Sequence, residues 1–201
     1  TGQGGLLDIA LHPGFSNNRY VYFTFVVSEN GYPRTALARA RFINGQFGAP
    51  ERLWTMKSKS AATIHFGSRL VFAPDGTLYL STGDRNMREL ARMPGEDAGK
   101  LLRLTDAGKV PPDNPFVGKS GYLPEIYSLG HRNIQGLTVH PKTGKVWLTE
   151  HGPKGGDEVN LAGAGMDYGW PLVTFGLEYS GATISASPYA PGITPPVLHW
   201  T

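Results

Sequence analysis

An apolar stretch that ends at a proline, then a short turn, then a second stretch rich in aromatic residues occurs three times along this chain of 201 residues. The three prolines are Pro13, Pro74 and Pro141, which lie 61 and 67 residues apart. The second and third copies have Asp-Gly and Thr-Gly pairs at 75–76 and 143–144, and glycine favours tight turns because it adopts positive φ without steric cost. Each copy therefore predicts a β-hairpin, and the regular spacing predicts a protein built from repeated sheet units.

Two further strand candidates, at 36–42 and 100–104, lie between these hairpins and alternate in character. We expect them to be outer strands whose charged residues face water. Together with the hairpins they predict the four-stranded blades of a β-propeller. The alternative is a Greek-key sandwich, in which the regular spacing of the prolines would be a coincidence. The segments 86–99 and 111–123 carry few strand signals beyond one or two helical turns at 87–93. In a propeller we expect such excursions to lie on the faces, where ligands bind.

The composition excludes several classes of protein. Charged residues make up only 17% of the chain, and the 27 glycines and 16 prolines are incompatible with a coiled coil or a charged helical bundle. Nine Phe, nine Tyr and four Trp need burial, so the chain is not simply disordered. The net charge is only +3 and the basic residues are scattered, so we expect no nucleic-acid partner. Without cysteine there are no disulfides, thiolate zinc sites or cysteine nucleophiles, and no apolar run approaches the ~18 residues of a membrane span.

Six short motifs follow one another along the chain. They are GQGGLLD at 2–8, HFGSRLVF at 65–72, GKLLRL at 99–104, GHRNIQG at 130–136, EHGPKGGDEVN at 150–160 and YGWP at 168–171. In this order they resemble the soluble quinoprotein sugar dehydrogenases, and most closely the aldose sugar dehydrogenase branch of the glucose/sorbosone dehydrogenase family, over essentially the whole chain. The resemblance implies an all-β, six-bladed β-propeller, of which residues 1–201 would form three to four blades of a single, incomplete domain. It also implies pyrroloquinoline quinone (PQQ) and Ca²⁺ as cofactors and a periplasmic or secreted protein.

A base is needed to oxidise a sugar hydroxyl, because a proton must leave oxygen as a hydride leaves carbon. A neutral histidine suits this task, since imidazole titrates near working pH. The resemblance assigns the role of base to His65. It also implies that the carboxylate of Asp84 orients this histidine and stabilises the imidazolium. Taken alone, the two residues also fit an ordinary loop histidine and a turn aspartate.

Cofactor contacts are expected in the motif at 130–136. A guanidinium and an amide placed together can hold the oxygens of a quinone and stabilise developing negative charge. By resemblance, Arg132 and Asn133 contact PQQ, with Arg132 also assisting the chemistry, and Gln3 is a further cofactor contact. A surface salt bridge is the alternative interpretation of Arg132.

Calcium prefers hard oxygen ligands, including backbone carbonyls, and a Gly-Pro turn exposes such carbonyls because proline has no N–H. By resemblance, the carbonyls of Gly152 and Pro153 hold the calcium that also binds the quinone, and His151 beside them contacts cofactor or substrate. Glu158 and the backbone at Tyr168 match a second, structural calcium site in some relatives. The alternative interpretation of Glu158 is a solvated acidic turn.

The resemblance implies oxidation of an aldose at its anomeric carbon to the lactone, with hydride transfer to the quinone and an external electron acceptor that reoxidises it. A calcium-dependent lactonase on a similar propeller is a second possibility, but it needs a cage of carboxylate and amide side chains. A non-catalytic interaction propeller is a third, disfavoured because His65 and Arg132 are both present. We interpret Trp170 in the YGWP motif as packing a tight corner, with sugar stacking as the alternative.

Overall fold

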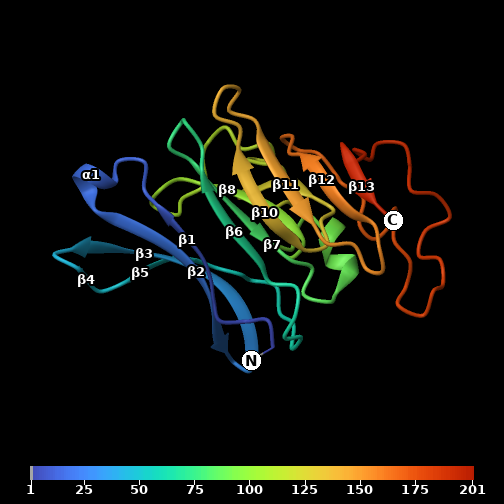
Figure 1. The fold of residues 1–201 in the computed structure, drawn as a ribbon, viewed down its shortest axis with the longest axis horizontal. Helices are drawn as coiled ribbons and strands as arrows, with labels where there is room; N and C mark the ends of the chain where they lie inside the picture. Colours follow the sequence, from blue (N-terminus) through green and yellow to red (C-terminus); the bar gives the residue numbers. More distant parts are fainter. Residues whose placement is uncertain (1) are drawn as a thin grey trace.

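The computed structural model describes residues 2–201, which form three antiparallel β-sheets with little helix (Figure 1). The first sheet consists of β1 (Leu6–Leu11), β2 (Tyr20–Glu29), β3 (Tyr32–Ile43), β4 (Gln46–Phe47) and β5 (Glu51–Thr55). The second consists of β6 (Gly67–Phe72), β7 (Leu78–Thr82), β8 (Lys100–Leu104) and β9 (Ile126–Leu129). The third consists of β10 (Ile134–Val139), β11 (Val146–Glu150), β12 (Asp157–Leu161) and β13 (Leu198–Trp200). The helices are the short α1 (Phe15–Asn18) and the 3-10 helix η1 (Arg88–Arg92).

The three repeats of the sequence are the hairpins β1–β2, β6–β7 and β10–β11, so the hairpin prediction is confirmed. Each sheet runs outward from its hairpin, and the first strands lie next to one another, with β6 in contact with both β1 and β10 (Figure 1). Sheets that repeat side by side with their first strands together are the blades of a propeller. The predicted all-β fold and partial β-propeller are therefore confirmed, as is the helical turn expected at 87–93.

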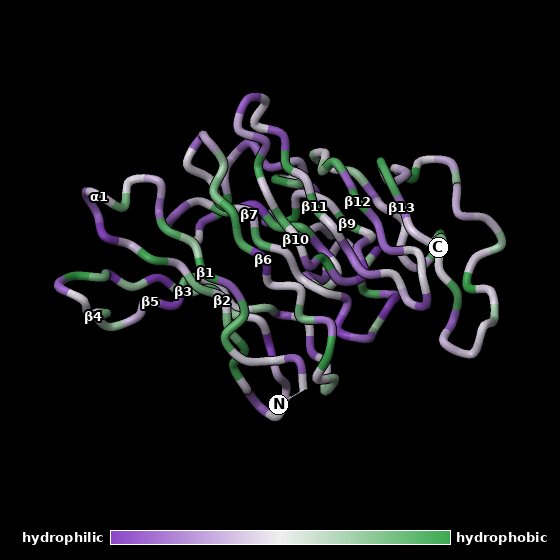
Figure 2. Tube along the Cα trace, viewed as in Figure 1, coloured by the Kyte–Doolittle hydropathy of each residue, from purple (hydrophilic) through white to green (hydrophobic). Residues whose placement is uncertain are grey.

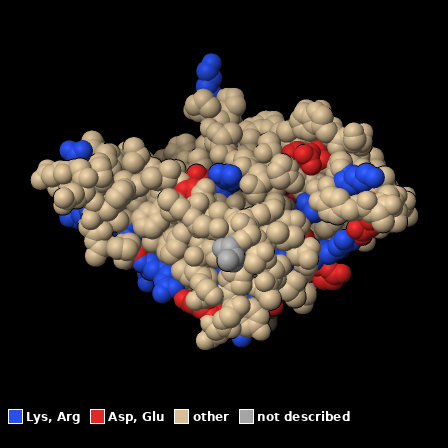
Figure 3. All heavy atoms as spheres, turned by 60° about the horizontal axis from the view of Figure 1, so that its bottom comes forward, with Lys and Arg blue, Asp and Glu red and all other residues tan. Residues whose placement is uncertain are grey.

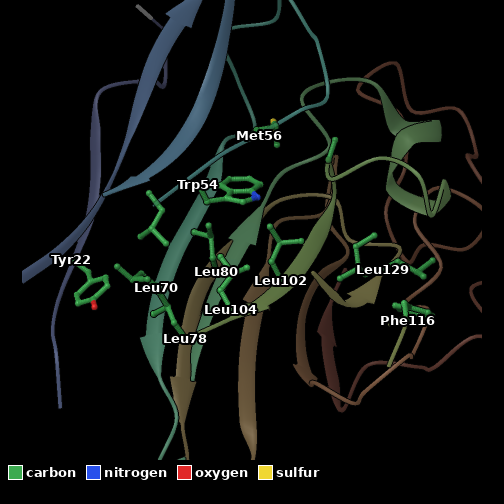
Figure 4. Close-up of a cluster of buried hydrophobic side chains, with 13 residues drawn as sticks. Tyr22, Trp54, Met56, Leu70, Leu78, Leu80, Leu102, Leu104, Phe116 and Leu129 are labelled. Atoms are coloured by element: carbon green, nitrogen blue, oxygen red, sulfur yellow. The ribbon is translucent and has the colours of Figure 1, made fainter. Parts of the chain in front are cut away.

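The core lies between neighbouring sheets, because strands buried on both faces send alternate side chains in opposite directions. From β7, Leu78 and Leu80 point toward the first sheet and join a cluster with Tyr22 and Trp54 (Figure 4). The neighbouring Tyr79 points the other way and packs with residues of the third sheet. Figure 2 shows hydrophobic stretches along the strands of the sheets. The sheets are thus held face to face, which fixes where their strand ends lie.

The expectation that 36–42 and 100–104 form outer strands with a wet charged face is wrong. All five residues of β8 are buried, including Lys100 and Arg103, because β9 pairs along its outer edge and a sheet covers each face. Arg103 is compensated by ion pairs with Asp75 and Asp113, each at 2.9 Å. The segment 36–42 lies within β3, between β2 and β5, and is largely buried. Of the charged residues in these two segments, only Arg41 is exposed.

The side chain of Lys100 contacts the segment 86–99, which contains η1. Its Nζ donates hydrogen bonds to the carbonyl oxygens of Leu90, Ala91 and Ala98 at 2.7, 3.0 and 2.7 Å. Burial lowers the pKa of Lys100 to about 7, because the charged amine is removed from water. The buried amine therefore fastens η1 to the second sheet.

Replacing Lys100 by methionine is expected to lower the free energy of unfolding by about 2–4 kcal/mol, because three buried carbonyls lose their donor. Chemical denaturation of the variant checks this value. The matched control is K142M, which removes an exposed lysine from the β10–β11 turn and should change stability by less than about 0.5 kcal/mol. Equal stability of the two variants would show that Lys100 does not hold η1.

The surface adds two findings. No helix in the described part of the chain is long and apolar enough to cross a membrane. On the face drawn in Figure 3, basic residues are scattered and interspersed with acidic ones. This face lacks the continuous basic stripe by which nucleic-acid partners are recognised.

Candidate active site

The predicted site residues converge because they flank equivalent strand ends. In an antiparallel hairpin, the start of the first strand lies beside the end of the second. Gln3, His65 and Arg132 precede β1, β6 and β10, whereas Asp84 and His151 follow β7 and β11. Since the first strands lie together, all these positions meet at one end of the three sheets.

A pocket of about 450 Å³ opens at this end of the sheets, within the range of small-molecule sites. Seven of the predicted residues line it, namely Gln3, His65, Arg132, Asn133, His151, Gly152 and Pro153. Gly155, Asp157, Tyr179, Trp200 and Thr201 complete the wall. The fold thus brings together predicted residues that lie up to 150 positions apart in the chain, from Gln3 to Pro153.

His65 and Asp84 form a buried pair at the edge of this pocket. His65 Nδ1 lies 2.7 Å from Asp84 Oδ1, and the two residues are 8% and 1% exposed. Gly83 makes the approach possible, because a Cβ at this position would lie 2.0 Å from the carbonyl oxygen of His65. With Nδ1 held by the carboxylate, Nε2 is the ring nitrogen left for the pocket. The pair has the geometry of a base and the carboxylate that orients it.

Two further groups fix Asp84. Its Oδ1 also accepts from the backbone N–H of Asn86 at 2.8 Å, and its Oδ2 accepts from Nε1 of Trp170 at 2.8 Å. Trp170 is only 5% exposed, so the sugar-stacking alternative is wrong for this residue. The tight-corner interpretation holds, but the contact with Asp84 was not predicted.

The amide side chains of Gln3 and Asn133 are each held by their oxygen. Gln3 Oε1 accepts from the backbone N–H of His65 at 2.8 Å. Asn133 Oδ1 accepts from the N–H of Gly67 at 3.1 Å and from Gln135 Nε2 at 3.0 Å. Both residues line the pocket, so their NH₂ groups are the polar atoms left to face a ligand.

Arg132 is 6% exposed and lies against the turn that follows β11. Its Nη1 donates to the carbonyl oxygens of His151 and Gly152 at 3.0 and 2.7 Å. The alternative of a surface salt bridge is wrong, because no carboxylate among residues 2–201 forms an ion pair with this guanidinium. Arg132 therefore contributes a positive charge without an ion-pair partner in the described part of the chain to the pocket wall, beside the amide donors.

The residues present fit an anionic quinone and one calcium ion. PQQ carries three carboxylates and quinone oxygens, all acceptors, and the guanidinium of Arg132 and two amide NH₂ groups are donors. The carbonyl of Gly152 accepts only one hydrogen bond from Arg132, and Pro153 and Asp157 lie in the same wall, so hard oxygen atoms are available to calcium. Across the described residues, no group of three or more His, Asp or Glu side chains could hold a metal, so carbonyl ligands are essential to this prediction.

Glu158 lies in strand β12, not in a solvated turn, so that alternative is wrong. The side-chain amide of Asn160 donates to both Glu150 and Glu158, at 3.1 and 3.0 Å. Burial and the nearby charge of Glu150 raise the pKa of Glu158 to about 8. A cavity of about 10 Å³, large enough for one water-sized particle, is lined by these two glutamates and Tyr168 among others. A buried and a half-buried carboxyl group beside one small cavity fit the predicted structural cation.

Comparison with known proteins identifies the family. The family model described as Glucose / Sorbosone dehydrogenase matches residues 1–201. The chain belongs to this family. Aldose sugar dehydrogenase YliI of Escherichia coli is 40% identical over 99% of this chain and 55% of its own length. Quinoprotein glucose dehydrogenase B of Acinetobacter calcoaceticus is 34% identical over 90% of this chain and 42% of its own length.

A solved structure agrees with this membership. The PQQ-bound form of aldose sugar dehydrogenase from Streptomyces coelicolor is 32% identical, with a TM-score of 0.82 over 100% of this chain and 55% of that chain. This glucose/sorbosone dehydrogenase family member thus spans about half the length of the curated relatives it matches.

A buried network in this family member was missed from the sequence. His131 is fully buried and stacks on Tyr168, and its ring nitrogens lie 2.9 Å from Ser128 Oγ and 2.8 Å from Glu150 Oε1. Glu150 Oε2 also accepts from the backbone N–H of Arg132 at 2.7 Å. The available signal was the place of His131 and Glu150 inside the motifs at 130–136 and 150–160. The network supports Arg132 from behind the pocket.

Proposed function

We propose that this chain carries the base and cofactor contacts of a PQQ- and calcium-dependent enzyme that oxidises aldoses at the anomeric carbon to the lactone. The observation that carries the proposal is the His65–Asp84 pair at the edge of a pocket that also holds Arg132, Asn133 and Gln3. The proposal is supported by a relative named as a quinoprotein and by a similar structure that contains PQQ.

His65 accepts the proton in the proposed reaction. Its Nε2 takes the proton of the anomeric hydroxyl, and Asp84 stabilises the positive charge that then spreads to Nδ1. A base placed in this way accelerates proton transfer by about 10²–10⁴-fold. When bound, PQQ together with calcium supplies the electrophilic centre that receives the hydride, and an external acceptor removes the electrons.

Arg132, Asn133 and Gln3 hold the cofactor in this proposal. The guanidinium of Arg132 stabilises negative charge on a quinone oxygen, and such a contact is stronger where protein surrounds it than where water does. The carbonyls of Gly152 and Pro153 hold the calcium, and His151 lies beside them as a cofactor contact. Glu158 with the Tyr168 backbone is the proposed site of a second, structural calcium.

Two wider proposals follow from the family. Residues 1–201 belong to one propeller domain, which is supported by the family model that matches all of them. A periplasmic or secreted location and an external electron acceptor remain predictions from the resemblance. The lactonase alternative is disfavoured because the described residues hold no side-chain metal cage. The interaction-module alternative is disfavoured because the base and its carboxylate are in contact.

Reconstitution tests this function. The protein in its full natural length is mixed with PQQ and Ca²⁺, binding is followed by quinone absorbance, and dye reduction is measured with glucose and other aldoses. We expect aldose-dependent reduction that requires both cofactors and is lost when a chelator removes calcium. Bound PQQ without dye reduction for any aldose would favour the interaction module instead.

A further inference from the structure

Trp170 contacts two separate parts of the candidate active site. Its indole N–H donates to Asp84 Oδ2 at 2.8 Å, although the two residues are 86 positions apart in sequence. The guanidinium groups of Arg88 and Arg132 each lie 5.5 Å from the centre of its ring. The side chain is 5% exposed, so it is not a surface for a sugar.

We propose that Trp170 is a positioning residue that orients Asp84 toward His65 and supports the guanidinium of Arg132. The inference rests on the proposed function, in which His65 is the base and Arg132 a cofactor contact. Trp170 acts through these residues, since it is not among the residues that line the 450 Å³ pocket.

The carboxylate of Asp84 needs a donor on each oxygen. Oδ1 faces His65 Nδ1 and the N–H of Asn86, whereas Oδ2 is reached by Trp170 alone among the residues that the structure describes. Asp84 is 1% exposed, so water cannot replace a missing donor without a rearrangement. Loss of the indole N–H therefore frees the carboxylate to rotate and release His65.

The charged groups around Asp84 do not substitute for Trp170. Arg85 donates to the carbonyls of Pro33, Ala62 and Ile64. Arg88 forms a two-point ion pair with Glu178, and Arg132 donates to the carbonyls of the 151–152 turn. Each guanidinium is engaged elsewhere, so the indole N–H is the group that holds the second oxygen.

The ring of Trp170 has a separate effect. A cation over an aromatic face is attracted by about 0.5–2 kcal/mol, depending on how far it is desolvated. Phenylalanine keeps an aromatic face but has no N–H donor, whereas leucine has neither. The two variants W170F and W170L therefore separate the effect on Asp84 from the effect on Arg132.

Kinetics on the full-length enzyme loaded with PQQ and Ca²⁺ test the effect on catalysis. For W170F we expect kcat to fall about 10–100-fold, as for a misplaced reacting group, with KM for the aldose changed less than about threefold. W170L should also weaken PQQ binding.

The control is W147F, which alters a tryptophan of β11 outside the pocket and should leave kcat unchanged. In a double-mutant cycle, D84A and D84A/W170F should have equal kcat, because Trp170 acts through Asp84.

A measurement on the protein without cofactor tests the contact independently of activity. The ¹⁵N indole resonance of Trp170 should be protected from solvent exchange and should shift in D84A. An indole resonance unchanged by D84A overturns the inference, as does wild-type kcat in W170F or an undiminished effect of W170F in the D84A background. If the resonance shifts but the wild-type enzyme oxidises no aldose, the proposed function fails and the catalytic consequence of the contact fails with it. This indole measurement needs no tryptophan variant, so it also decides the case in which W170F does not fold.

Discussion

Replacing His65 by alanine is expected to lower kcat for aldose oxidation by about 10²–10⁴-fold, the contribution of a well-placed general base. PQQ and calcium should still bind, because the donors that face the cofactor come from Gln3, Arg132 and Asn133. Dye reduction at saturating aldose measures the first effect, and the absorbance of bound quinone measures the second. The expected result is therefore a protein that binds the proposed cofactor but turns over far more slowly.

The matched control for this prediction is H140A. His140 is an exposed histidine at the β10–β11 turn, where it accepts from two backbone N–H groups of that turn. We expect H140A to retain wild-type kcat. Full activity in H65A, with H140A equally active, would mean that another group removes the proton.

The hairpins could be predicted because they depend on local sequence. An apolar run, a proline and a turn pair lie within about fifteen residues, and two such strands pair wherever they occur. The burial of β8 could not be predicted in this way. Its Lys100 and Arg103 give a strand that looks half-exposed, but their partners lie in η1, in the β6–β7 turn and in the segment after β8. The burial of Lys100 and Arg103 depends on partners outside β8, so the sequence of the strand alone did not reveal it.

The candidate site was likewise predictable where it depends on local sequence and on the repeat. His65 and Arg132 lie in recognisable motifs, Asp84 directly follows a predicted strand, and the repeat brings these strand ends together. The contact between Trp170 and Asp84 joins the loop between β12 and β13 to the end of β7. No periodicity connects the two positions, so only the packed sheets reveal the contact. The His131–Glu150 pair differs in this respect, because it joins the start of β10 to the end of β11 within one hairpin.

Arg132 carries the second large effect. Replacing it by alanine removes the positive charge of the pocket wall and the two hydrogen bonds that hold the carbonyls of His151 and Gly152. We expect kcat to fall about 10²–10³-fold, as when a donor to developing negative charge is lost. Because Gly152 is also a proposed calcium ligand, a higher calcium concentration should be needed for activity. Kinetics over a calcium titration measure both changes.

Replacing Arg132 by lysine separates the effect of its positive charge from the effect of its hydrogen-bond geometry. A single ammonium keeps the charge, but it lacks the planar fork of donors with which a guanidinium reaches two carbonyls and a ligand together. We therefore expect R132K to recover part of kcat while keeping the raised calcium requirement. The control is R41A, an exposed arginine on β3, which should match the wild type in both measurements. If R132A needed no more calcium than the wild type, the 151–153 turn would be held independently of Arg132. The proposed link between the quinone contact and the calcium carbonyls would then be wrong, although the loss of kcat would stand.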